Sequence, residues 1–96
     1  MTQPLAVRCD PDGVGWRCDV TVGDDPAATS HEVTMSAATL ASLAPGAADP
    51  EALVRASFEF LLAREPRESI LRRFDLMVIR RYFPEWEGEI RRRISI

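Results

Sequence analysis

Apolar and polar residues alternate from Leu5 to Met35, and this pattern constrains the fold more than any other feature of the sequence. A period of two places neighbouring side chains on opposite faces of a strand. The run is interrupted over 10–15 and again over 23–30, where Pro, Asp and Gly favour a change of chain direction. The sequence therefore predicts a three-stranded antiparallel meander over 5–35.

The side chains of the first two predicted strands indicate the register in which these strands pair. The register that sets Cys9 opposite Cys18 pairs apolar residues along one face. On the other face it sets Arg8 against Asp19, with a second pair of opposite charges beside them, and such pairs stabilise neighbouring strands. The register of the third strand stays open, because a two-residue turn at 24–25 and a longer loop both keep the same face inward.

The apolar spacing becomes helical over 36–96. Ser36 is a typical N-cap and predicts a helix that runs to about Leu43. Asp49, followed by proline and glutamate, predicts a second helix that runs to Arg64 and carries the widest apolar stripe. This second helix is the expected core helix.

Shorter helices are predicted in the rest of the chain. Pro66 opens the first of them, in which Ile70, Leu71 and Phe74 are expected to face inward. Asp75 caps the next, and the last follows a later proline, with acidic residues early and arginines late.

Length and composition fit a single domain over 1–96. An apolar fraction of 46% and a charged fraction of 28% provide for a core without disulfide or metal support. The predicted fold class is α+β, with the meander over 5–35 followed by a helical part over 36–96, in which about four helices pack on one face of the sheet. With no apolar run of membrane-spanning length and no signal-peptide pattern, we expect a soluble, cytoplasmic protein without a membrane partner.

One block of the sequence resembles a known family. The chain is similar to a family of short bacterial proteins of unknown function in the segments Ser57-Phe58-Glu59-Phe60-Leu61-Leu62, Arg64-Glu65-Pro66, Glu68-Ser69-Ile70-Leu71, Arg73-Phe74-Asp75-Leu76 and Tyr82-Phe83-Pro84-Glu85. The resemblance covers roughly residues 31–90. It implies one complete small bacterial protein and brings no activity with it.

Cys9, Cys18 and His31 point to the same face of the predicted meander. A two-residue second turn would align all three as soft ligands of the type that zinc accepts. No fourth ligand is evident, so we predict no metal and no cofactor. Buried thiols beside a hydrogen-bonded histidine are the favoured interpretation, and a redox-sensitive pair formed by Cys9 and Cys18 is the alternative. In a reducing cytoplasm both cysteines are expected to be free thiols.

The segment 68–83 is the candidate for nucleic-acid binding. Two short helices joined at Asp75 would form a helix-turn-helix, in which one arginine pair contacts phosphates and the other reaches base edges. These arginines are Arg72, Arg73, Arg80 and Arg81. The net charge of −3 argues against a protein that coats nucleic acid through bulk charge.

No residue set predicts catalysis, because the single histidine is the only conventional base for a nucleophile, and Glu65 is interpreted as a cap or surface charge. We therefore predict a non-catalytic binding or regulatory module that acts through a protein surface on an unidentified partner or a second copy. The candidate surface is the stripe Trp86, Ile90 and Ile94, although its packing on the chain's own core is the favoured interpretation. A nucleic-acid-binding protein is the alternative function.

Overall fold

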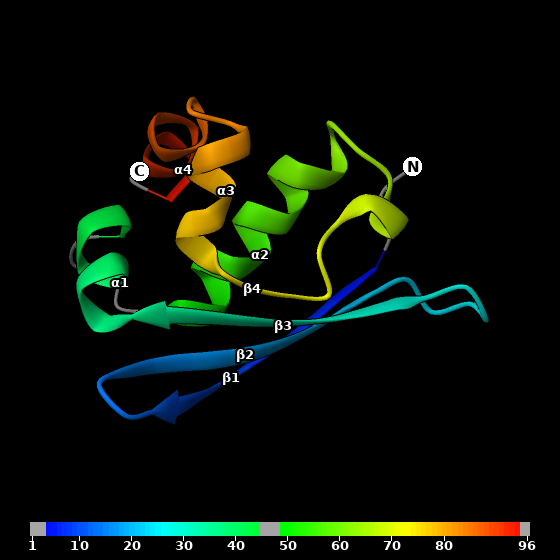
Figure 1. The fold of residues 1–96 in the computed structure, drawn as a ribbon, viewed down its shortest axis with the longest axis horizontal. Coiled ribbons are helices and arrows are strands. Elements are labelled where there is room, and N and C mark those ends of the chain that lie inside the picture. Colours follow the sequence, from blue (N-terminus) through cyan, green and yellow to red (C-terminus); the bar gives the residue numbers. More distant parts are fainter. Residues whose placement is uncertain (1–3, 45–48, 95–96) are drawn as a thin grey trace.

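The computed structural model describes residues 4–44 and 49–94, which form a four-stranded sheet with helices on one face (Figure 1). The strands are β1 (Leu5–Asp12), β2 (Gly15–Val22), β3 (Thr29–Ser36) and β4 (Arg73–Asp75), and they lie in this order in the sheet. β1, β2 and β3 form the predicted antiparallel meander, and β4 adds a fourth strand parallel to β3. The α+β fold class is confirmed, with one strand more than expected.

The predicted register of the first hairpin is confirmed, since Cys9 lies opposite Cys18 and Arg8 opposite Asp19. The register of β3 follows from the longer of the two connections, which runs over 23–28. It sets Cys18 opposite Val33, so the alignment of Cys18 with the histidine that a two-residue turn would give does not occur.

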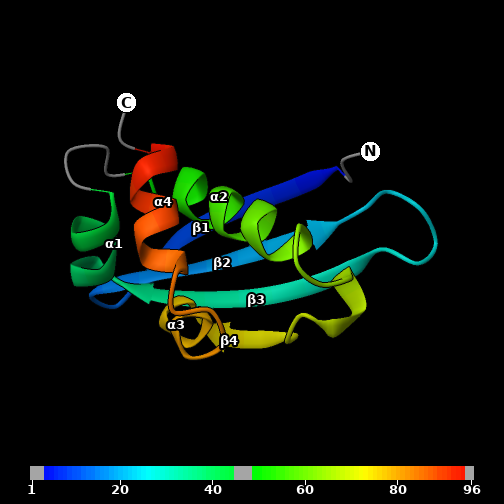
Figure 2. The ribbon, with the colours of Figure 1, turned by 90° about the horizontal axis from the view of Figure 1, so that it is seen from above.

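The helices are α1 (Ala37–Leu43), α2 (Pro50–Leu62), α3 (Ile79–Tyr82) and α4 (Trp86–Ile94). Figure 2 shows α2 and α4 side by side above the sheet, with α1 beside them at its end. The two predicted N-caps are confirmed: the Ser36 hydroxyl accepts from a backbone N–H of α1, and the Asp49 carboxylate accepts from two backbone N–H groups of α2.

The prediction of a helix opened by Pro66 is wrong. Only a single 3-10 turn, η1 (Arg67–Ser69), forms there, and the chain then extends into β4. The free edge of β3 supplies the reason, because the Glu32 N–H donates to the Arg72 carbonyl at 2.8 Å. Pairing of β4 with β3 satisfies backbone groups that a helix would leave exposed.

The extended conformation also changes which side chains face inward. Ile70 and Phe74 are buried as predicted, whereas Leu71 is 49% exposed and not part of the core. A second 3-10 turn, η2 (Leu76–Val78), follows β4 with Asp75 as its cap, and α3 is only four residues long. The segment 68–83 is therefore not a pair of helices joined by a turn, and the predicted helix-turn-helix is absent.

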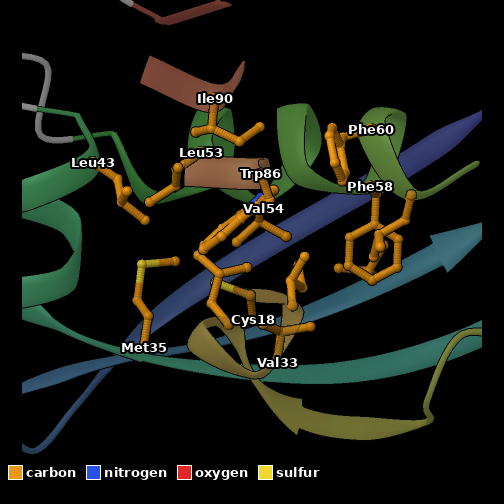
Figure 3. Packing of buried hydrophobic residues seen from close by; sticks show 14 of the residues in the cluster. Cys18, Val33, Met35, Leu43, Leu53, Val54, Phe58, Phe60, Trp86 and Ile90 are labelled. Carbon is orange, nitrogen blue, oxygen red and sulfur yellow. The ribbon is translucent and has the colours of Figure 1, made fainter. Parts of the chain in front are cut away.

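The core lies between the sheet and the helices, as Figure 3 shows. Trp86 and Ile90 of α4 are fully buried in it, and Ile94 packs partly against it. The indole Nε1–H of Trp86 donates to the Ser57 hydroxyl of α2 at 3.2 Å. The stripe on the last helix thus packs on the chain's own core, as the favoured interpretation expects, and offers no partner surface.

The outer edge of β1 contacts the side chains of α2. The Cys9 N–H donates to the Glu51 carboxylate at 3.1 Å, and the Arg55 guanidinium donates to the Leu5 carbonyl at 2.9 Å.

None of the helices in the described residues has the length and apolar character that a membrane-spanning helix needs.

Candidate functional site

An apolar hollow with a volume of about 350 Å³ lies where the end of α2, η1, β4 and α3 meet. We call it the β4 hollow. Its size is at the lower end of the range found for ligand pockets. Apolar side chains form most of its wall, and one carboxylate joins them. Its lining includes Leu61, Glu65, Leu71, Phe74, Tyr82 and Phe83.

The backbone on one side of the β4 hollow is held by two hydrogen bonds to β3. His31 Nδ1 contacts the Leu71 carbonyl oxygen at 2.7 Å, and the Glu32 N–H donates to the next carbonyl, that of Arg72. Burial of Ile70 on one side of the chain leaves Leu71 half-exposed at the hollow. The extended segment before β4 thus leaves Leu71 at the surface, whereas the predicted helix would have buried it.

Exposed apolar side chains gather at the β4 hollow. In the described part of the chain, only Val14, Leu71 and Tyr82 are large apolar or aromatic residues that are exposed. Val14 lies in the turn between β1 and β2, while Leu71 and Tyr82 both line the hollow, and Tyr82 is 68% exposed. Exposed apolar surface that is concentrated at one hollow is typical of an interaction site.

Glu65 is the charged residue in the wall of the β4 hollow, two residues beyond the C-cap of α2. Burial beside apolar side chains raises the pKa of its carboxyl group. Its carboxylate has no hydrogen-bond or ion-pair partner among the residues that the structure describes.

The arginines that flank Glu65 are engaged elsewhere. The Arg64 guanidinium lies 3.6 Å from the centre of the Phe60 ring and 3.7 Å from the Glu85 carboxylate. Arg67 donates to the Asp25 carboxylate at 2.9 Å, in the loop between β2 and β3. Neither neighbouring cation therefore neutralises the carboxylate in the hollow.

His31 is buried and hydrogen-bonded, as the favoured interpretation expects. Because a carbonyl oxygen can only accept, Nδ1 carries the proton toward Leu71, and Nε2 accepts from the Thr29 hydroxyl at 2.8 Å. Burial lowers the pKa of the imidazole, and the nearby charge of Arg72 acts in the same direction, while the bond to Leu71 opposes both. Both ring nitrogens are occupied, which leaves neither for a metal ion or a substrate.

The structure joins Cys9 and Cys18 in a disulfide, where the sequence analysis expected two free thiols. Their directly opposed positions on β1 and β2 bring the side chains within bonding reach, since their Cα atoms are 4.0 Å apart. Cys18 is fully buried and Cys9 is half-buried. In residues 4–44 and 49–94, no group of three or more His, Cys, Asp or Glu residues is placed to hold a metal ion.

The four arginines proposed for nucleic-acid contact do not form one basic surface. Arg73 of β4 pairs with Glu32 at 3.5 Å, and both line a polar hollow together with Arg72. Arg80 of α3 pairs with Glu87 of α4 at 3.0 Å. Arg72 and Arg81 are exposed without an ion pair to any described residue, and they lie in different segments of the chain.

No family model matches the chain, and neither a curated protein nor a solved structure matches it significantly. The function of the site is therefore argued from its geometry. Sequence reasoning missed the β4 hollow, because Leu71 was assigned to the core and Glu65 to surface charge. No local signal distinguished Glu65, because it stands among other charged residues over 64–68.

Proposed function

We propose that this chain is a small binding module that accommodates an apolar side chain of a protein partner in the β4 hollow. The observation that carries the proposal is the placement of Leu71 and Tyr82, both exposed, beside the same hollow. An apolar side chain that displaces water from this surface would gain about 25 cal/mol for each Å² of apolar area that becomes buried.

The size of the β4 hollow favours a short partner segment over a second copy of the chain. Ten residues line it, whereas a stable protein interface uses about 20–30 residues on each side. We therefore expect a transient complex with a peptide-like segment of another protein. A homodimer is the outcome that would replace this proposal.

We assign no catalytic step to the site. His31, the only histidine of the chain, already has both ring nitrogens in hydrogen bonds, and among the described residues no second carboxylate or histidine lines the hollow beside Glu65. Membership of the family of short bacterial proteins and a cytoplasmic location stay predictions that accompany this proposal.

Nuclear magnetic resonance (NMR) titration with the capped peptide acetyl-Ala-Leu-Leu-Ala-amide tests the proposal. We expect amide shift changes around the β4 hollow, with a Kd of the order of millimolar, and their loss in Leu71→Ser. Val14→Ser is the matched control, because Val14 is the exposed apolar residue that lies away from the hollow. Shift changes elsewhere on the surface, or equal losses in both variants, would contradict the proposal.

Sedimentation of the same proteins distinguishes a partner segment from a second copy. We expect the protein and Leu71→Ser to sediment as monomers at micromolar concentration. A dimer that dissociates on this substitution would show that a second copy occupies the hollow.

A further inference from the structure

We infer that Glu65 makes the β4 hollow selective for a partner segment in which a Lys or Arg stands directly beside the apolar side chain. The inference rests on the proposed function and adds the chemistry of the partner. The structure places one carboxylate in an otherwise mainly apolar wall, and it provides that carboxylate with no cation from the described part of this chain.

The position of Glu65 is defined by the end of α2. Its backbone N–H donates to the Leu61 carbonyl at 2.9 Å, which continues the hydrogen bonding of the helix. Leu61 and Glu65, which are four residues apart, both line the β4 hollow. The backbone of Glu65 thus continues the turn that carries Leu61, and its side chain lines the hollow beside that residue.

A neutral apolar ligand would remove further water from the Glu65 carboxylate. Burial already disfavours the charged form, which is the cause of the raised pKa. A charge that loses water without gaining a partner costs free energy, and a cation at hydrogen-bond distance reverses that effect. The hollow should therefore discriminate against a neutral segment and in favour of a cationic one.

Aromatic side chains at the β4 hollow add to the preference for a cation. Tyr82 is exposed there, and Phe74 and Phe83 complete the aromatic part of the wall. The face of an aromatic ring attracts ammonium and guanidinium groups that lie within about 6 Å. The same chain shows this contact internally, where Arg64 stacks on Phe60.

The two arginines on either side of Glu65 cannot serve as the missing cation without losing their own contacts. Movement of Arg64 toward the hollow would abandon the Phe60 ring and Glu85. Arg67 is held between Asp25 and Glu68. A cation for Glu65 is therefore expected from the partner.

Two capped peptides that differ in one charge test the inference. Acetyl-Leu-Leu-Lys-amide supplies the cation, and acetyl-Leu-Leu-norleucine-amide has the same chain length without it. Titrated by NMR at neutral pH, the lysine peptide should bind the protein about fivefold more tightly, which corresponds to a partly screened ion pair. Glu65→Gln should abolish this preference, whereas the matched control Glu68→Gln, which removes a charge three residues along the chain, should retain it.

A second measurement needs no variant. The carboxyl carbon of Glu65, followed by NMR during a pH titration, should report a pKa that falls when the lysine peptide is added and rises when the norleucine peptide is added. This readout keeps the inference testable if Glu65→Gln does not fold.

The outcomes separate the two proposals. Equal affinity of both peptides for the β4 hollow would overturn the role of Glu65 and leave the proposed function standing. Failure of both peptides to bind at the hollow would overturn the proposed function and the inference with it. A preference for lysine that persists in Glu65→Gln would also overturn the inference, because another group would then attract the cation.

Discussion

The imidazole Nδ1–H of His31 donates to the Leu71 carbonyl at 2.7 Å, and this bond connects the buried core to the β4 hollow. The other ring nitrogen accepts from the Thr29 hydroxyl, and the ring lies 5.3 Å from that of Phe58. A neutral imidazole satisfies both bonds in this tautomer. The protonation state of the buried His31 ring therefore influences the position of Leu71 at the surface.

We expect the stability of the protein to fall as the pH drops below about 6.5. The pKa of His31 is lowered in the folded state by burial, so the unfolded chain takes up a proton first. The stability contributed by the neutral ring is complete above the unfolded pKa of 6.5 and is lost as the pH falls toward the lower, folded value. Urea unfolding across this pH range, compared with His31→Gln, measures the effect.

The comparison with His31→Gln separates this effect from those of the carboxylates. The pKa of Asp25 is lowered by its hydrogen bond to Arg67, so its contribution disappears only in more acidic solution. Parallel pH profiles for the protein and the variant would show that His31 is not the group responsible.

Phe58→Ala is expected to destabilise the domain by about 3–5 kcal/mol, because a large side chain is removed from a fully packed site. Phe58 is fully buried, and its ring also lies 6.2 Å from that of Phe74. Arg72→Ala is the control and should cost little, since the Arg72 side chain is exposed and its structural contact is made by its carbonyl. Comparable losses of unfolding free energy in both variants would contradict the packing described here.

The Cys9–Cys18 pair is expected to be open in a reducing environment and closed in an oxidising one. Opening the link, whose cysteines are 9 residues apart, should cost about 2–3 kcal/mol of unfolding free energy. Urea unfolding with and without a reductant measures the difference. The double variant Cys9→Ser with Cys18→Ser should have the same stability with and without the reductant.

Thiol titration of the protein after anaerobic purification tests the state of the pair in the cell. It should find two reactive thiols in the denatured chain, and a smaller number without released metal would show that the disulfide persists in the cell.

Arg67→Ala is expected to loosen the loop between β2 and β3. Arg67 donates to the Val22 carbonyl and the Asp25 carboxylate, and it packs so closely on Gly23 that a side chain there would collide with it. Amide hydrogen exchange should become faster over 23–28. Arg67→Lys should restore little, because an ammonium group lacks the planar fork that reaches several acceptors.

We expect no salt-sensitive binding to duplex DNA. Two of the four arginines have acidic partners, since Arg73 of β4 pairs with Glu32 and Arg80 of α3 pairs with Glu87. Titration against duplex at low and physiological salt provides the measurement. Sub-micromolar affinity that falls steeply with salt and vanishes in Arg80→Ala with Arg81→Ala would favour the nucleic-acid alternative.

The parts of the fold that the sequence predicted are those with two independent local signals. The first hairpin combined apolar pairs on one face with charge pairs on the other, and α2 combined a capping Asp49 with Pro50 at its first position. Such signals act between residues close in sequence. The structure confirms both.

The segment over 70–75, whose structure the sequence did not predict, depends on contacts between residues that are far apart in the chain. Ile70, Leu71 and Phe74 have a spacing that fits a helix, and a strand of three residues is too short to show a period of two. Only the edge of β3, about 40 residues earlier, makes the extended conformation favourable. The β4 hollow is lined by residues of this segment, so it was missed for the same reason.

Glu51 and Arg55 lie one turn apart on α2, and their contacts with the Cys9 N–H and the Leu5 carbonyl cover the outer edge of β1. An unpaired strand edge is a template on which another chain can add a strand, and long exposed edges promote aggregation. On β1 an incoming strand would have to displace a carboxylate and a guanidinium to reach those backbone groups. At the opposite side of the sheet, β4 offers only three residues. Partners of this protein are therefore expected to recognise its side chains and not to extend its sheet.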